Sequence, residues 1–146
     1  MRISKKGLYA LQAMMRLAKD YHHPPVTIHT IAVSEGIPEK FLELILHHLK
    51  SARLLESVRG ARGGYGLKRS PSKIFLGEII RTIDGPLAPL ADAAGLRRLV
   101  KQDRQHSALY RVFLDVRNAA ARILDHTSLA DLAQGRRARV LERRNR

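Results

Sequence analysis

The chain of 146 residues lacks cysteine and tryptophan, and aromatic residues account for only 5% of it. Without cysteine, the protein forms no disulfide, carries no thiolate nucleophile and holds no cysteine-ligated zinc or iron–sulfur cluster. With so few aromatic residues, the core has to be built mainly from Leu, Ile, Val and Ala side chains, which favours helices. We therefore expect a mainly helical protein without thiol chemistry.

Long apolar runs are also missing. No stretch of 18 apolar residues occurs, and the apolar segment after the basic start is interrupted by Gln12 and Arg16, unlike a secretory signal. The sequence shows no pairing of a nucleophile with a base and no motif of paired carboxylates. We expect a cytoplasmic protein that is not an enzyme and has no membrane partner.

Acidic residues are scarce, since 13 Asp and Glu stand against 27 Lys and Arg and the net charge is +14. An excess of this size indicates a polyanionic partner, either nucleic acid or an anionic membrane surface, unless the chain is simply a basic protein. The excess is +7 in residues 1–70, +2 in 71–133 and +5 in 134–146. This distribution is typical of a DNA-binding head joined to a segment that associates with itself.

Helical periodicity and a hairpin pattern occupy the first 70 residues. We expect helices over residues 4–21, 28–35 and 37–51, the last two joined by a turn at Gly36. Two short helices joined in this way form a helix-turn-helix motif, although other helical hairpins share the pattern. Residues 54–59 and 65–68 have strand character around a glycine-rich turn, which indicates a β-hairpin, or wing. The pattern argues against a phosphate-binding loop there, because a strand follows the turn and the Lys-Ser/Thr ending is missing.

The C-terminal half is predicted to associate with a second copy. We expect a helix over residues 76–84, a loosely structured segment over 86–95, a long helix over 103–125 and a helical turn over 128–132. The long helix carries an apolar stripe, which we predict to be the dimer interface: Leu109, Val112, Val116, Ala120 and Ile123.

These patterns predict a mainly α fold with a small β-hairpin wing. The winged helix-turn-helix DNA-binding domain would span residues 1–84, and a linker with the dimerisation helix would span 85–133. The polar tail over 134–146 would be basic and disordered.

Four segments carry a family resemblance: MRISKKGLYAL at residues 1–11, GIPEKFLE at 36–43, SVRGARGGY at 57–65 and LGEII at 76–80. Their order and spacing resemble the Rrf2 family of bacterial transcriptional regulators, strongly as far as Pro86 and weakly again at 128–132. The resemblance implies a sequence-specific homodimer, a repressor in our hypothesis, that binds a partly palindromic operator in double-stranded DNA.

The resemblance also implies which positions contact DNA. The base-reading positions of the family correspond to Pro38, Lys40, Phe41, Glu43 and Leu44, and Leu44 replaces a commonly polar residue. In the wing, Arg59 matches an arginine that enters the minor groove, and Arg62 is an addition. Arg53 stands where the family usually has glycine, so a left-handed backbone there would be strained. The full set of predicted DNA contacts is Thr27, His29, Pro38, Glu39, Lys40, Phe41, Glu43, Leu44, His47, Lys50, Arg59, Gly60, Arg62, Gly63, Gly64 and Tyr65.

Chemistry supports this assignment without deciding it. On a helix in the major groove, Glu43 can accept a hydrogen bond from cytosine, and Lys40 can donate to guanine or phosphate. The alternative is that these side chains form the solvated face of an amphipathic helix. The wing after the helix makes DNA binding the better interpretation.

Cofactor ligands are missing where the family would place them. Iron–sulfur members carry three cysteines between the winged module and the long helix, whereas the stretch over residues 91–106 has none here. We predict no cofactor, and a metal site assembled from other ligands across a dimer remains an alternative. Two further alternatives stay open: a sensor that responds to a protein partner or a small ligand, and a non-specific architectural DNA-binding protein.

Overall fold

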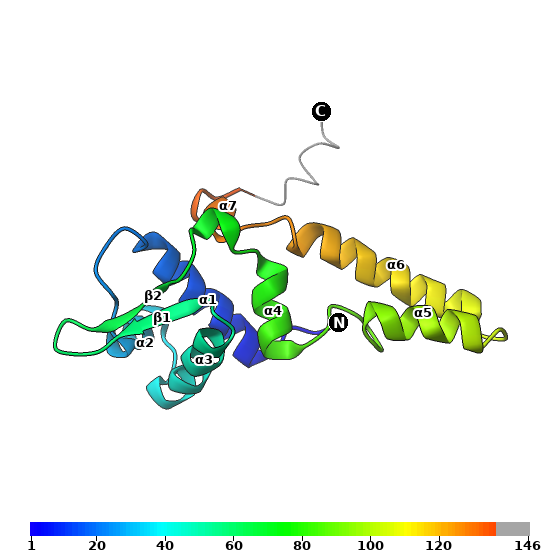
Figure 1. Ribbon diagram of the computed structural model, residues 1–146, viewed down its shortest axis with the longest axis horizontal. Helices are drawn as coiled ribbons and strands as arrows, with labels where there is room; N and C mark the ends of the chain where they lie inside the picture. Colours follow the sequence, from blue (N-terminus) through cyan, green and yellow to red (C-terminus); the bar gives the residue numbers. More distant parts are fainter. Residues whose placement is uncertain (137–146) are drawn as a thin grey trace.

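The computed structural model describes residues 1–136, in which a hairpin of two helices projects from a winged helical head (Figure 1). The head contains α1 (Lys5–Lys19), α2 (Ile28–Glu35), α3 (Glu39–Ser51), β1 (Leu55–Val58), β2 (Gly64–Leu67), η1 (Pro71–Lys73), α4 (Leu76–Asp84) and α7 (Leu129–Ala133). The hairpin consists of α5 (Ala93–Gln102) and α6 (Ser107–Leu124). The predicted class, mainly α with a two-stranded antiparallel wing, is confirmed.

Helix ends follow the capping signals in the sequence. The Ser4 side chain accepts a hydrogen bond from the Gly7 amide at the start of α1, and Thr27 caps α2 in the same way. Gly36 ends α2 with a left-handed backbone, φ 64°. Arg53 is left-handed as well, with φ 61°, so the strain expected from a side chain at this glycine position is present.

The core of the head lies between α1 and α3. Ala10, Ala13, Met14 and Leu17 of α1 are buried, and they belong to one apolar cluster with residues from α2, α3, β1 and α4. From α3 the cluster takes every inward position of its amphipathic pattern: Leu42, Ile45, Leu46 and Leu49. Burial of this face turns the opposite face of α3 to solvent.

The C-terminal end of the described chain returns to the head. After α6, Leu129 of α7 is fully buried in the head core, and Phe75 and Ser128 form a β-bridge. Ser128 and Asp131 cap α7 reciprocally. The predicted 85–133 segment therefore ends against the winged module. Residues 137–146 of the predicted tail lie outside the described residues.

Helix α5 corrects the sequence analysis. Residues 86–95 were predicted to be loosely structured and the long helix to begin at residue 103, but α5 covers residues 93–102 and α6 begins at Ser107. Asp92 caps α5 by accepting a hydrogen bond from the Gly95 amide at 2.7 Å. Leu96 is buried completely against the rest of the hairpin. One side of α6 is thus covered within the same chain, which the sequence pattern had not indicated.

None of the helices described in residues 1–136 combines the length and the apolarity needed to cross a membrane.

Candidate nucleic-acid interface

The outer face of α3 carries the polar side chains that the sequence pattern placed there. Glu39, Lys40, Glu43, His47 and Lys50 are all exposed. Among them lies Leu44, which is 60% exposed although it is apolar. The face therefore offers charged hydrogen-bonding groups around one methyl-bearing side chain, and such a group can pack against a thymine methyl in the major groove.

Helix α2 is joined to the start of α3 by a surface contact. The Nδ1 atom of His29 lies 3.3 Å from Oε2 of Glu39, and both side chains are more than half exposed. Thr27, the residue that caps the start of α2 two positions before His29, is also exposed. Pro38 is exposed just before α3 begins. These four predicted contact residues therefore lie on the solvent side of the helix-turn-helix.

Phe41 is oriented differently from its neighbours. It is partly buried and packs edge-on against Tyr9 of α1, with 5.6 Å between the ring centroids. Its ring therefore helps to hold α3 on α1. Of the predicted base-reading positions, this one has a clear packing role in the head.

The wing presents its two arginines at the tip. The strands pair in register from Leu55 opposite Leu67 to Val58 opposite Gly64, and the turn that joins them leaves Arg59 and Arg62 exposed. Gly60 has a φ of 109°, a value that side chains disfavour, and its carbonyl accepts a hydrogen bond from the Gly63 amide at 2.9 Å.

Three of the wing residues predicted to contact DNA have structural roles. A Cβ atom on Gly63 or Gly64 would overlap backbone atoms of the wing or of Val26. Tyr65 is partly buried, and its amide and carbonyl exchange hydrogen bonds with those of Val26 at 2.7 and 2.9 Å. These contacts anchor the wing to the loop between α1 and α2, so they orient the arginine tip.

One pair in this region was missed by the sequence analysis. Nζ of Lys6 lies 3.0 Å from Nδ1 of His48, so the basic start of α1 adjoins the second half of α3. Arg2 and Lys5 are exposed nearby in the chain. The basic residues at the N-terminus were visible in the sequence, but their position beside α3 is determined by the fold.

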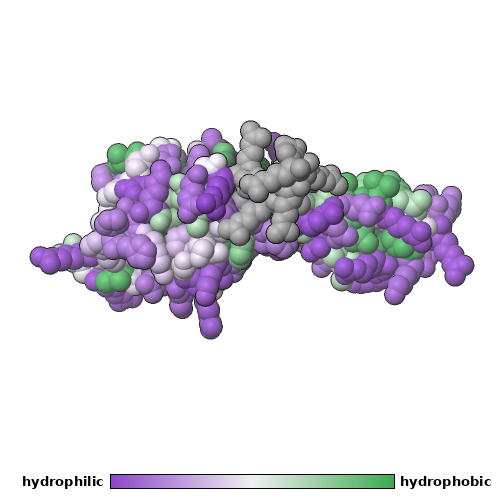
Figure 2. Space-filling model, turned by 90° about the horizontal axis from the view of Figure 1, so that it is seen from above, coloured by the Kyte–Doolittle hydropathy of each residue, from purple (hydrophilic) through white to green (hydrophobic). Residues whose placement is uncertain are grey.

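The predicted dimerisation stripe is largely exposed in the single chain. Leu109, Val112 and Val116 are 48%, 56% and 47% exposed, whereas Ala120 and Ile123 are partly buried. Figure 2 shows the apolar surface that gathers over the hairpin, beyond the more polar surface of the head. Three large apolar side chains in successive turns of one helix leave this face without cover in a monomer.

The stretch between the winged module and α6 does not provide the ligands of an iron–sulfur cluster. It contains no cysteine, and its carboxylates have other partners. Asp92 caps α5, and Asp103 accepts hydrogen bonds from the Tyr110 hydroxyl at 3.0 Å and from the His106 side chain at 2.9 Å. The bond from His106 is the main reason that the pKa of Asp103 is lowered. Within residues 1–136, no three His, Asp or Glu side chains are grouped as metal ligands would be.

Comparison with known proteins gives a consistent assignment. The model of the Rrf2 family, described as an iron-dependent transcriptional regulator, matches residues 3–135. The chain belongs to the Rrf2 family. It is therefore a DNA-binding transcriptional regulator of the helix-turn-helix type, in agreement with the sequence analysis. The family description mentions iron, but this chain lacks the cysteines that hold a cluster.

Individual relatives cover nearly the whole chain. The transcriptional regulator CymR of Bacillus subtilis is 37% identical over 133 residues, which are 91% of this chain and 90% of CymR. The solved structure of CymR, the global cysteine regulator of B. subtilis, superposes with a TM-score of 0.79 at 34% identity, covering 92% of this chain and 98% of that one. The structure of IscR from T. potens gives a TM-score of 0.61 at 30% identity, covering 92% and 88%.

Proposed function

We propose that this regulator represses transcription as a homodimer on a partly palindromic operator. In each copy, α3 lies in the major groove, and Arg59 at the wing tip enters the adjacent minor groove. The observation that carries the proposal is the exposed polar face of α3 beside an anchored wing that holds Arg59 and Arg62 in solvent. A narrow minor groove has the most negative potential on B-DNA and attracts arginine.

The proposed specificity comes from a small group of side chains. Glu43 accepts from cytosine and Lys40 donates to guanine or phosphate, whereas Leu44 contacts a thymine methyl. His29, His47 and Lys50 contact phosphates of the DNA backbone and thereby fix the position of the protein on the duplex. Phe41, Gly63, Gly64 and Tyr65 act by orienting α3 and the wing.

The exposed stripe on α6 provides the proposed dimer contact. Two copies of the stripe formed by Leu109, Val112 and Val116 would cover each other about a two-fold axis. The hairpins would then hold the two heads apart, so that the two α3 helices meet half-sites about one helical turn, or about 34 Å, apart. Residues 1–84 would be the DNA-binding part, and residues 85–133 would provide the dimer contact.

In vitro selection from a library of random DNA duplexes tests this proposal. We expect enrichment of one sequence with two inverted half-sites, and we expect the variant Lys40→Ala/Glu43→Ala to change or lose the enriched bases. A competition titration with unrelated DNA then separates the regulator from an architectural protein. Equal affinity for selected and random duplexes would contradict sequence-specific binding.

A further inference from the structure

A cavity of about 290 Å³ lies where the winged head meets the helical hairpin. Its walls come from both parts of the molecule: Arg81 and Gly85 from the end of α4, Pro86 and Leu87 from the connecting loop, Asp92 and Ala93 from the start of α5, and Arg117 from α6. The volume is at the lower end of the range for small-molecule sites. A metabolite-sized ligand in this cavity would touch the head and the hairpin at once.

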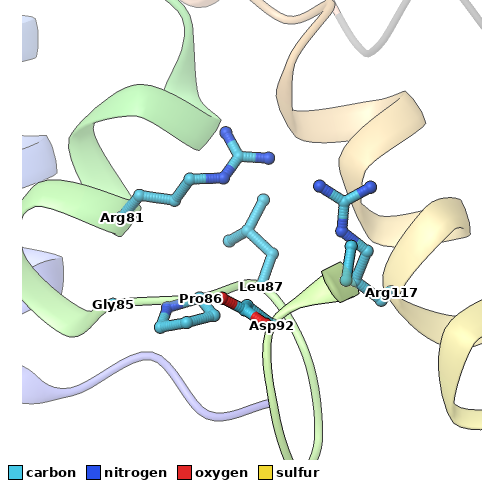
Figure 3. A pocket seen from close by; sticks show the side chains of 7 residues that line it. Arg81, Gly85, Pro86, Leu87, Asp92 and Arg117 are labelled. Atoms are coloured by element: carbon cyan, nitrogen blue, oxygen red, sulfur yellow. The ribbon is translucent and has the colours of Figure 1, made fainter. Parts of the chain in front are cut away.

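Two guanidinium groups dominate one side of the cavity. Arg81 reaches in from α4 and Arg117 from α6, and both end above the Leu87 side chain (Figure 3). The charge of Arg81 is matched, because both of its Nη atoms donate to Asp125 at 2.6 and 2.8 Å. Arg117 is partly buried, and no carboxylate within residues 1–136 forms an ion pair with it. Among the described residues, its side chain donates a hydrogen bond to the neighbouring Asn118 side chain at 3.2 Å.

The cavity therefore holds one guanidinium, that of Arg117, which has no ion-pair partner among the described residues, beside its apolar floor. A guanidinium has five N–H donors, and most of those on Arg117 are left for a ligand. Leu87 is only 2% exposed and forms the floor with Pro86, while Ala93 supplies a small apolar wall. Asp92 also lines the cavity and is exposed, and it forms no ion pair with Arg81 or Arg117. This carboxylate and Asp125 would repel a second negative charge, so the arrangement selects a monoanion.

We propose that this cavity binds an effector with one carboxylate on a small branched apolar body. The carboxylate is held by Arg117 with Arg81 beside it, in the paired geometry that guanidinium groups offer to carboxylates, and the apolar body lies on Leu87. Neither a dianionic phosphate nor a neutral amide fits this balance of charges.

The inference rests on the proposed function, because the ligand can change DNA affinity only if the protein binds its operator as the proposed dimer. Arg81 belongs to the head, whereas Arg117 and Asp125 belong to α6 and its end. A carboxylate between the two arginines competes with Asp125 for Arg81 and changes how the hairpin is held on the head. In a dimer joined by its hairpins, this change alters the separation of the two α3 helices. An effector acts in this way only if it binds one arrangement better than the other.

The binding part is tested without DNA on the full-length, ¹⁵N-labelled protein by NMR titration. The probes are 4-methylpentanoate, its uncharged amide 4-methylpentanamide, and inorganic phosphate. We expect 4-methylpentanoate to shift the amide signals around Leu87, Ala93 and Arg117, and to bind at least tenfold more tightly than either other probe. The absence of binding by the carboxylate, or equal binding by the amide or phosphate, would overturn the assignment.

Two variants and one control locate the site. Arg117→Gln removes the unmatched charge, and Ala93→Leu fills the cavity with a residue of good helix propensity. Each should weaken 4-methylpentanoate binding at least tenfold, with unchanged thermal unfolding measured by circular dichroism. The control, Arg111→Gln, removes a charge from an exposed position of α6, the helix that carries Arg117. This variant should bind the probe as the wild type does. Wild-type binding by both pocket variants would refute the site.

The regulatory part uses the duplex enriched by in vitro selection. Saturating 4-methylpentanoate should change the affinity of the wild type for this duplex at least threefold, and should leave Arg117→Gln unaffected. An unchanged affinity in the wild type would refute the effector role. If selection enriches no duplex, the proposed operator binding fails, whereas the NMR titration still decides the ligand site.

Discussion

Arg81 of α4 donates two hydrogen bonds to Asp125, the residue directly after α6: Nη1 to Oδ1 at 2.6 Å and Nη2 to Oδ2 at 2.8 Å. The two residues are 44 positions apart in the chain, and they tie the head to the end of the hairpin where α6 returns to it (Figure 1). Gly77 permits the contact, since a Cβ atom there would overlap the Asp125 carboxylate. The packing of Asp125 against α4 therefore requires a glycine at this position of the LGEII segment.

The Arg81–Asp125 pair should make stability depend on pH. Hydrogen bonding from Arg81 is the largest cause that lowers the pKa of Asp125 below its ordinary value of 3.8. A carboxyl with a depressed pKa stabilises the folded state above its unfolded-state pKa, and this contribution disappears as pH falls through the folded-state pKa. Asp125→Asn should therefore be less stable than the wild type at neutral pH, and the difference should vanish in strong acid, well below pH 3.8.

Urea unfolding followed by circular dichroism at both pH values measures this difference. Both side chains of the pair are about 35% exposed, so we expect no more than about 1 kcal/mol at neutral pH. Asp115→Asn, an exposed carboxylate on the same helix, is the matched control and should show little change. A difference for Asp125→Asn that persists in strong acid would show that the charge of the pair is not its cause.

Arg59→Ala should weaken binding to the selected operator by about 1–3 kcal/mol without affecting folding. The side chain is exposed at the wing tip and contributes nothing to the core, so its loss removes a groove contact only. Fluorescence anisotropy with a labelled duplex measures the change. Arg97→Ala removes the same charge from an exposed position of α5 and should have a much smaller effect. Equal losses in the two variants would mean that general charge, and not the wing, determines the affinity.

Val116→Glu should convert the proposed dimer to monomers and reduce operator affinity strongly. The change places a charge in the centre of the exposed α6 stripe, where a dimer would have to bury it without a partner. Sedimentation equilibrium gives the mass. Arg111→Glu introduces the same side chain at an exposed position on another side of α6 and should remain dimeric. A dimeric Val116→Glu variant would place the interface elsewhere.

Anaerobic reconstitution with iron and sulfide should leave the protein without a stoichiometric cluster. Soft thiolate ligands are missing from the whole sequence, and Asp92 and Asp103 already have hydrogen-bond partners. Visible absorption and iron analysis after gel filtration measure the outcome, and iron chelators should not change DNA affinity. A bound chromophore with about one cluster per chain would show that this chain uses ligands of another kind.

Much of the DNA-binding head was predictable because its signals are local. Capping residues, the glycine turn after α2 and the periodic burial of α3 each involve residues within a few positions of one another. The same holds for the exposure of Glu43 and Lys40, which follows from the burial of the opposite face. The inward packing of Phe41 could not be inferred in this way, because it depends on Tyr9 of another helix.

The hairpin was harder to predict because short-range signals there are weak. Helix α5 follows a segment rich in Ala and Pro and is only ten residues long, so Asp92 and the spacing of Leu96, Leu99 and Val100 are the signals that indicate it. Contact with α6 compensates for this weak local preference by burying Leu96. Packing against α6 adds the stabilisation that a helix of this length needs, since isolated helices shorter than about 12 residues are marginal in water.

By itself, the sequence determined the family, the winged helix-turn-helix, the absence of thiol ligands and the apolar stripe of α6. Tertiary structure decided which side of α6 is covered by α5, where α7 returns to the head, and that Arg81 and Arg117 line the same cavity as Leu87. The physical reason is sequence separation. Caps, turns and amphipathic faces arise from neighbours in the chain, whereas a cavity between α4 and α6 exists only after helices about 40 residues apart have packed together.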